Sequence, residues 1–337
     1  MRTGSDGAIG GLRFALVAAA FALHTVPLDA VAQVKILTGV DAYDVSIGED
    51  LATLIAEPVD MRLDVLPSPS SPETLGRLRS DPGVNLAAVQ SDVFEAFVAQ
   101  DVRARSRRPD STSPPPRVVL RLPEKEVHFL ARADAPFEYV HQIRDARINV
   151  GTQGGSTATT TEAIYRLLFG KTLARNQTSY LPHEEALVKL VTDGTIDVVA
   201  IAAAQPAPLL AKMTPEARQY VKVLRLDADR LPSPAVTRAY PVATLRASSY
   251  PALLTKDQPT LAVEMYIVTL DYRDHVTETR LIQFGRSLCR NFSALRTKGQ
   301  PKWREVEPLL TPLPNGWNYY PPTRDELRNC KRGSARG

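Results

Sequence analysis

Cysteine and histidine are scarce in this sequence, with two cysteines and five histidines among 337 residues. Both cysteines lie near the C-terminus, and no two histidines are spaced i, i+4. A metal centre needs more ligands than two distant cysteines supply. The sequence therefore predicts neither a metal nor another cofactor. In an exported chain, it favours a disulfide between Cys289 and Cys330.

Long hydrophobic runs are also missing beyond the first thirty residues. Arg2 and Arg13 precede the apolar stretch from Phe14 to Leu23, and Ala30-Val31-Ala32 follows as a small-x-small cleavage site. This pattern predicts a cleaved signal peptide over residues 1–32, since the apolar stretch is too short to span a bilayer. A buried N-terminal helix is the alternative. We expect the mature chain to begin near Gln33 and to be a soluble, periplasmic protein.

An excess of one charge sign is absent as well. The chain has 41 lysines and arginines against 37 aspartates and glutamates, a formal net charge of +4. No basic stripe with interleaved aromatic residues is visible, so nucleic acid is not expected as a partner. The densest basic cluster, Arg103 to Arg108, lies beside prolines and is predicted to be a solvated loop.

Catalytic signatures are missing too. The sequence has no G-x-S-x-G elbow and no H-E-x-x-H pair. Gly170-Lys171-Thr172 resembles the end of a phosphate-binding loop, but Tyr165 occupies the position where that loop needs its first glycine. We therefore expect that the protein is not an enzyme. A hydrolase whose triad is dispersed along the chain is the alternative.

Short β-branched runs alternate with amphipathic helical stretches along the chain, which predicts an α/β fold with a mainly parallel sheet. The predicted strands are 34–37, 63–66, 85–89, 117–122, 126–132, 147–150, 196–201 and 261–269. The predicted helices include 74–80, 158–169, 184–193 and 273–295. The tail, 299–322, is expected to be irregular and held by the cysteine pair.

Ligands of open α/β sheets bind where strands end and helices begin. Four such junctions are predicted, at 38–46, 90–92, 151–157 and 203–206. The junction 151–157 combines glycines with Ser156 and Thr157 ahead of a helix. Converging backbone N–H groups, hydroxyl donors and a helix N-terminus are suited to binding an anion. An ordinary tight turn between strand and helix is the alternative.

Six stretches of the chain, in this order, resemble the TAXI-type solute receptors of tripartite ATP-independent periplasmic (TRAP) transporters. They are Ile36 to Gly39, Val89 to Val93, Val127 to Asp134, Asn149 to Thr157, Asp193 to Pro206, and Ser249-Tyr250 with Pro259 to Val263.

The resemblance implies a monomeric periplasmic-binding-protein fold with two α/β lobes, which close on a ligand in the cleft between them. We expect lobe 1 at 33–128 and 235–337, lobe 2 at 133–228, and hinge strands near 128–133 and 228–236. The implied ligand is a small anionic organic molecule, a carboxylate or amino acid like glutamate or 2-oxoglutarate. The implied partner is a TRAP-type membrane permease. A membrane sensor remains the alternative partner, because both uses need the same cleft.

The resemblance also implies a set of ligand-binding residues at the four junctions. They are Thr38, Gly39, Val40, Tyr43, Gln90, Ser91, Gly151, Gly155, Ser156, Thr157, Gln205 and Pro206. The first loop departs from the family, because Asp41 and Asp44 would repel an anion from the cleft. These aspartates therefore face solvent, or the ligand carries an ammonium group, or this chain has lost the family's ligand.

Overall fold

A mixed ten-stranded sheet runs through the described residues, 32–107, 113–306 and 310–333, of the computed structural model. These residues belong to one compact unit, Val31–Gly337. Its strands, in chain order, are β1 Ala32–Thr38, β2 Met61–Pro67, β3 Val84–Gln90, β4 Pro116–Arg132, β5 Ile148–Asn149, β6 Thr178–Ser179, β7 Val198–Ala203, β8 Val221–Val223, β9 Val242–Leu245 and β10 Gln258–Leu270.

The order of the strands is β2-β1-β3-β10-β4-β7-β5-β6, with β8 paired to β4 and β9 to β10. Pairing is parallel within β2-β1-β3 and within β7-β5-β6, as the alternation of strands and helices predicted. β10 and β4 are antiparallel to each other and to their neighbours. They therefore join two parallel halves, here called the β1–β3 half and the β7–β5 half.

Helices cover both faces of each half. The α-helices are α1 Ala42–Leu51, α2 Ser71–Ser80, α3 Ser91–Arg107, α4 Ser156–Phe169, α5 His183–Thr192, α6 Pro208–Ala211, α7 Ala235–Ala239, α8 His275–Lys298 and α9 Pro321–Gly333. A π-helical stretch, η1 Ala52–Ala56, extends α1. The 3-10 segments are η2 Glu57–Val59, η3 Val140–Gln142, η4 Arg175–Gln177, η5 Pro215–Gln219, η6 Ala228–Arg230 and η7 Pro301–Glu305.

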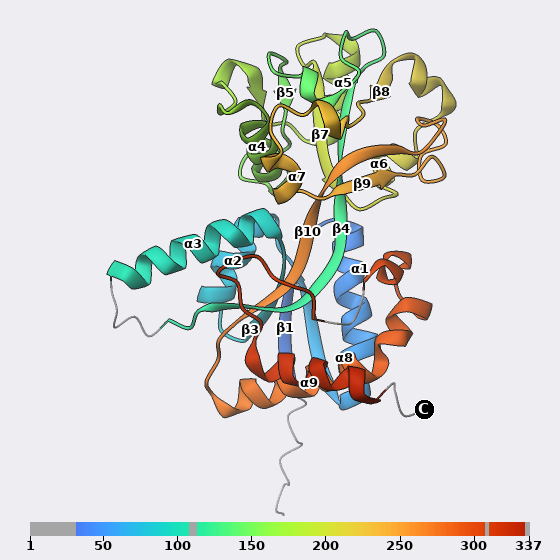
Figure 1. Cartoon of the computed structure of the whole chain (residues 1–337). Helices are drawn as coiled ribbons and strands as arrows, with labels where there is room; N and C mark the ends of the chain where they lie inside the picture. Colours follow the sequence, from blue (N-terminus) through green and yellow to red (C-terminus); the bar gives the residue numbers. More distant parts are fainter. Residues whose placement is uncertain (1–31, 108–112, 307–309, 334–337) are drawn as a thin grey trace, which may run out of the picture. The chain divides into compact units, whose positions relative to one another are not determined.

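Two long strands, β4 and β10, run between the two halves (Figure 1). The expected strands 117–122 and 126–132 are one continuous strand. The prediction of a hinge strand at 228–236 was wrong, because this stretch contains η6 and the start of α7. Pro232 and Pro234 have no backbone N–H to donate to a ladder, which disfavours a strand there. β10 is the second crossing strand instead.

The core lies on both faces of the sheet, since successive side chains of a strand alternate. In β1, Val34 and Ile36 join a cluster with α1, α8 and α9, while Leu37 joins a cluster with α2 and α3. In β7, Val198 packs toward α4 and α7, and Val199 packs toward α5 and α6. Each half therefore has its own pair of hydrophobic layers.

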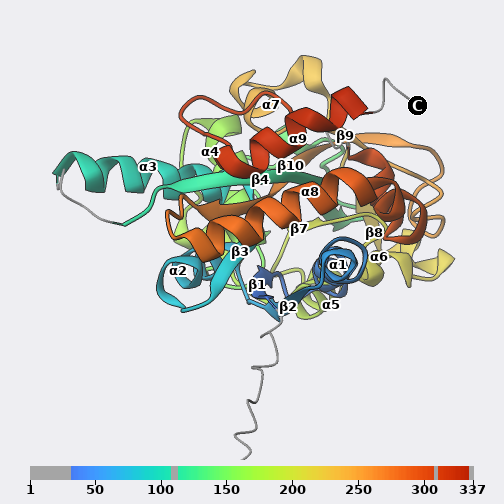
Figure 2. The ribbon, with the colours of Figure 1, turned by 90° about the horizontal axis from the view of Figure 1, so that it is seen from below.

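The C-terminal helices α8 and α9 lie side by side (Figure 2), and the disulfide Cys289–Cys330 joins them as expected. Asp274 caps α8 by accepting a hydrogen bond from the Thr277 N–H at 2.8 Å. The expectation of an irregular tail was wrong in part, because α9 begins at Pro321. A proline suits the first turn of a helix, where no N–H partner is needed.

The arginine cluster also differs from its prediction as a loop. Arg103, Arg105 and Arg107 lie on α3, which ends at Arg107, and Arg108 is outside the described residues. Asp101 accepts hydrogen bonds from Arg79 at 2.6 Å and from Arg105 at 2.7 Å. Basic side chains in the last turn also interact favourably with the helix dipole, so α3 extends into the stretch that was expected to be a loop.

Candidate functional site

Four helix N-termini meet around one cavity of about 270 Å³. The N-cap residues of α1, α2, α4 and α5 all line it, and they are Asp41, Ser70, Gly155 and Pro182. The first N–H groups of a helix have no partner within the helix, and they carry the positive end of its dipole. The cavity wall is therefore rich in groups that attract and bind an anion.

A second cavity of about 210 Å³ adjoins the first. The lining residues come from both the β1–β3 half and the β7–β5 half, so the two cavities lie between the halves. The residues shared by both cavities are Asp41, Asp44, Lys125, Thr157, His183, Glu184 and Ala202.

A buried ion pair forms part of the wall between the cavities. The Lys125 ammonium donates to the Asp44 carboxylate at 2.6 Å and lies 3.9 Å from Asp41. Burial raises the pKa of Asp44, and Lys125 offsets only part of that effect. Burial alone would lower the pKa of Lys125, but the carboxylates of Asp44 and Asp41 outweigh it and raise that pKa. Lys125 is therefore an ammonium group at neutral pH.

The aspartates of the first loop both line the cavity, so the interpretation that they merely face solvent does not hold for Asp44, which is 7% exposed. Lys125 compensates its charge. Gly39 makes room for this pair, because a Cβ at position 39 would lie 2.0 Å from Asp44 Oδ2. The repulsion expected from the sequence is thereby reduced to the exposed carboxylate of Asp41.

The start of α5 adds His183 and Glu184 to both cavities. Burial lowers the pKa of His183, against the opposing effect of Asp41 and Glu184, so the ring is neutral at pH 7. Its Nδ1 is buried and has no hydrogen-bond partner within the described residues. The Glu184 carboxylate is exposed. Asp41 and Glu184 therefore place negative charge at the N-termini of α1 and α5, whereas the cavity-lining residues at the N-termini of α2 and α4 are uncharged.

The glycine-containing loop before α4 reaches the cavity, and its hydroxyls are partly engaged. The Ser71 N–H of α2 donates to Ser156 Oγ at 2.9 Å, and the two hydroxyls lie 3.1 Å apart. Thr157 Oγ1 accepts from the Ala202 N–H at 3.4 Å, which leaves the hydroxyl hydrogen for a ligand. A Cβ at Gly155 would lie 2.9 Å from Thr152 O, so this glycine is required by the turn itself.

The sequence-predicted residues divide into two sets. Those lining one or both cavities are Gly39, Val40, Tyr43, Gly155, Ser156 and Thr157. Those that line neither cavity are Thr38, Gln90, Ser91, Gly151, Gln205 and Pro206. Thr38 is fully buried and donates to the Gly39 carbonyl at 3.2 Å. Gly151 has φ +87°, a conformation that favours glycine.

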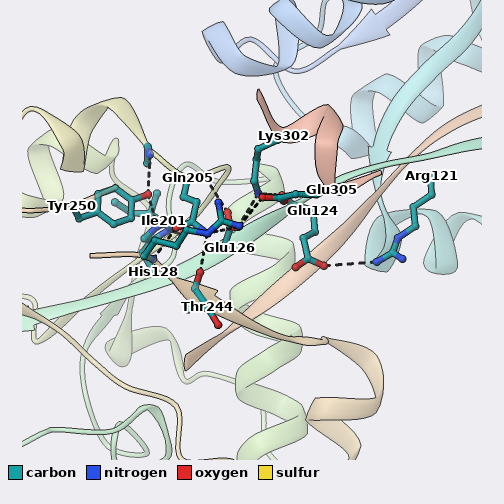
Figure 3. Close-up of polar contacts among 12 residues, drawn as sticks. Arg121, Glu124, Glu126, His128, Ile201, Gln205, Thr244, Tyr250, Lys302 and Glu305 are labelled. Carbon is teal, nitrogen blue, oxygen red and sulfur yellow. Dashed lines mark hydrogen bonds and ion pairs between the residues drawn. The ribbon is translucent and has the colours of Figure 1, made fainter. Parts of the chain in front are cut away.

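The Gln205 side chain belongs to a buried hydrogen-bond network around Glu126 of β4 (Figure 3). Its amide nitrogen donates to Glu126 Oε1 and to the Thr244 carbonyl, each at 2.8 Å. Its amide oxygen accepts from the Arg246 N–H at 2.9 Å. Lys302 donates to Glu126 Oε1 at 2.7 Å. Gln205 is thus fully hydrogen-bonded within the protein and supports the crossing strand.

Lys125, Ser71, His183 and Glu184 were missed as site residues. A signal existed for the start of α2, because Ser70-Ser71-Pro72-Glu73 follows a strand with the pattern of a helix N-terminus. The sequence signal that Lys125 belongs to the site is weaker, because it is only a charged residue between two apolar stretches of a strand. Which face it occupies depends on the register of β4 against β10, which shifts between Val263 and Met265.

The chain belongs to the NMT1-like family, whose model matches residues 39–279. No curated protein matches it. It is similar to XAC2383 from Xanthomonas citri bound to chloride ion, with 15% identity over 90% of this chain and 98% of that one, and a TM-score of 0.44. It is also similar to the periplasmic aliphatic sulphonate binding protein of Escherichia coli, with 15% identity, 88% and 83% coverage, and a TM-score of 0.44. A TctC solute binding protein from Polaromonas has 14% identity, 82% and 88% coverage, and a TM-score of 0.43.

Two further features are absent from the described residues. No group of three or more histidine, cysteine, aspartate or glutamate side chains there is arranged to hold a metal ion. Across those same ranges, no helix has both the length and the apolar character needed to cross a membrane.

Proposed function

We propose that this protein is a periplasmic solute-binding protein that captures a small carboxylate, and that its preferred ligand also carries an ammonium group. The observation that carries the proposal is the convergence of four helix N-termini and Lys125 on cavities between the two halves of the sheet. Membership of the NMT1-like family and the likeness to solute-binding proteins are in keeping with it.

The charges in the cavities suggest how such a ligand is oriented. Its carboxylate lies toward the N-termini of α2 and α4, where Ser71 and Thr157 offer hydroxyl donors and Lys125 offers an ammonium. Its own ammonium group lies toward Asp41 and Glu184. Among the described residues, Lys125 is the one lysine or arginine that lies within 4.0 Å of either carboxylate, at 3.9 Å from Asp41. A dicarboxylate without that group would meet these two carboxylates uncompensated.

We further propose that the two halves are lobes that move about the crossing strands. The hydrophobic clusters suggest boundaries near residue 125 in β4 and residue 264 in β10. The second lobe would then be about 127–263, longer than the 133–228 expected from the sequence. Closure over a ligand by movement about a few hinge residues is a common mode of domain motion.

The proposed partner is a TRAP-type membrane permease, on the resemblance to TAXI-type receptors. The alternative is a membrane sensor that reads the same closed state. A permease gene beside this one would favour transport, and a histidine kinase gene would favour sensing. Loss of ligand uptake on deletion of the gene is expected for transport alone.

Binding without catalysis fits the polar groups of the site. His183 is the one histidine among the described residues that line the cavities. No hydrogen bond joins its ring to a serine, threonine or carboxylate within that part of the chain. A base without an adjacent nucleophile does not form a hydrolytic triad.

Calorimetry with L-glutamate and 2-oxoglutarate tests the proposal, because the two share a carbon skeleton and differ in an ammonium or a keto group. We expect glutamate to bind at least tenfold more tightly to the mature protein. A double variant that combines Asp41→Asn and Glu184→Gln should show a reduced or reversed preference. Equal binding of both ligands by both proteins would contradict the proposed orientation, and binding of neither would contradict the ligand class.

A further inference from the structure

We propose that Asp92 is a positioning residue that holds the two halves of the molecule together beside the ligand cavities. Asp92 lies in the first turn of α3, and its carboxylate Oδ2 accepts two hydrogen bonds from the β7–β5 half. Thr160 of α4 donates at 2.6 Å, and the Tyr240 hydroxyl, just after α7, donates at 2.9 Å. The other oxygen, Oδ1, accepts from the Val93 N–H at 2.8 Å.

Both side chains that donate to Asp92 are buried in the protein. Thr160 is 0% exposed and Tyr240 is 2% exposed, and Tyr240 packs in the hydrophobic cluster of α4 and α7. Their two hydroxyls therefore approach the same oxygen from fixed positions. Asp92, Thr160 and Tyr240 do not line either cavity. The contact can thus hold the halves together without touching the ligand.

Hydrogen bonds to an ionised carboxylate are stronger than those between neutral groups, and more so away from water. Separation of the halves would break both bonds at once. Their gain is opposed by the cost of burying the charge, since burial raises the pKa of Asp92 and the two hydroxyl donors only partly counter it. A contact whose gain is opposed in this way can hold the halves together and still release them.

This role of Asp92 also explains why Gln90 and Ser91, which were predicted to bind the ligand, do not line the cavities. Gln90 and Ser91 precede Asp92, lie at the junction of β3 and α3, and are buried away from the cavities. Gln90 Oε1 lies 3.5 Å from the Thr160 hydroxyl. Within the segment Val89 to Val93, Gln90 and Asp92 therefore contact α4 across the two halves and do not line the cavities.

The inference rests on the proposed function only for the importance of closure, so its test uses no ligand. Spin labels at Ala96→Cys, on α3, and Thr172→Cys, after α4, report the distance between the halves, and both positions are exposed. The test variant combines Thr160→Val with Tyr240→Phe, which removes both donors with little change in volume. The matched control is Thr161→Val, because Thr161 Oγ1 is buried with no partner among the described residues.

We expect one short distance for the unchanged protein and for the Thr161→Val control. The double variant should shift to longer distances, with the ratio of closed to open molecules falling at least tenfold. Each single variant, Thr160→Val or Tyr240→Phe, should shift partway, and these serve if the double variant unfolds by circular dichroism. A double or single variant with the original distance, or a control that opens equally, would overturn the role of Asp92. A failure to find any ligand would leave these distances unaffected and would count against the proposed function alone.

Discussion

Lys125 and Lys302 are equally buried, each with 5% of its surface exposed, and each is paired with a carboxylate near the crossing of β4. They differ in how many hydrogen bonds their ammonium groups donate within the protein. Lys302 donates to the Glu124 carbonyl and to Glu126, both at 2.7 Å, and lies 3.6 Å from Glu305. Among the described residues, Lys125 makes one hydrogen bond, to Asp44, and lines both cavities.

The difference separates polar groups that stabilise the scaffold from those available to a ligand. A buried lysine with all its donors satisfied is fixed in place, and its loss leaves a carboxylate without compensation. A buried lysine with donors to spare at a cavity gains from a bound anion. We therefore expect the face of β4 that carries Lys125 to contribute to ligand binding, and the face that carries Glu126, paired with Lys302 of η7, to stabilise the fold.

The largest expected effect is on the Lys302 side. Lys302→Met should lower the free energy of unfolding by roughly 3–5 kcal/mol, because Glu126 is then buried without its cation. Adding Glu126→Gln should restore much of that loss in urea unfolding. An equally stable Lys302→Met protein would show that this network contributes little to the fold.

Acid should weaken the same face through His128, which is fully buried. Its Nε2 lies 2.8 Å from the Tyr250 hydroxyl and its Nδ1 lies 3.2 Å from the Ile201 carbonyl. Burial lowers its pKa to about 4. The unfolded chain thus binds the proton more readily, and stability present above the ordinary pKa of about 6.5 is lost as the pH falls toward 4. The expected loss is roughly 3 kcal/mol.

Unfolding curves measured between pH 7 and pH 4 check this expectation. His128→Gln should flatten the loss of stability with acid, whereas His275→Gln, at an exposed histidine, should not. The same slope in both variants would assign the acid sensitivity to other groups.

A smaller effect is expected on the cavity side. The combined change Ser156→Ala and Thr157→Val should weaken ligand binding at least tenfold, about 1.4 kcal/mol, by removing hydroxyls at the N-terminus of α4. Thr159→Val, on the same helix but outside the cavities, should bind like the unchanged protein in calorimetry. If the double variant bound the ligand with unchanged affinity, the ligand's carboxylate would not lie at this loop.

Much of the fold could be predicted from sequence, because local patterns determine most of its strands and helices. The periodic helix α4 and the buried strand β3 are examples, and the predicted loop before α4 brings Gly155, Ser156 and Thr157 to the wall of the first cavity. The sequence predicted β10 as a strand. The family resemblance, however, placed the second crossing strand at 228–236, where two prolines disfavour a strand.

The charged side of the site could not be predicted in the same way. Lys125, Asp44 and His183 come from distant parts of the chain, and their contacts depend on strand register and on the helix starts that meet at the cavity. Gln205 illustrates the converse. It follows β7 at a junction where the sequence predicted ligand binding, yet its hydrogen bonds to Glu126 and Thr244 make it part of the scaffold.

Calorimetry of L-glutamate with two charge-neutral double variants tests the contrast between the lysines most directly. One variant is Lys125→Met with Asp44→Asn, and the other is Lys302→Met with Glu126→Gln, so that each removes a whole ion pair. We predict that both fold, that the first loses at least tenfold in affinity, and that the second binds like the unchanged protein. Equal affinity in the two variants, or a loss confined to the Lys302 variant, would contradict the assignment of Lys125 to the ligand.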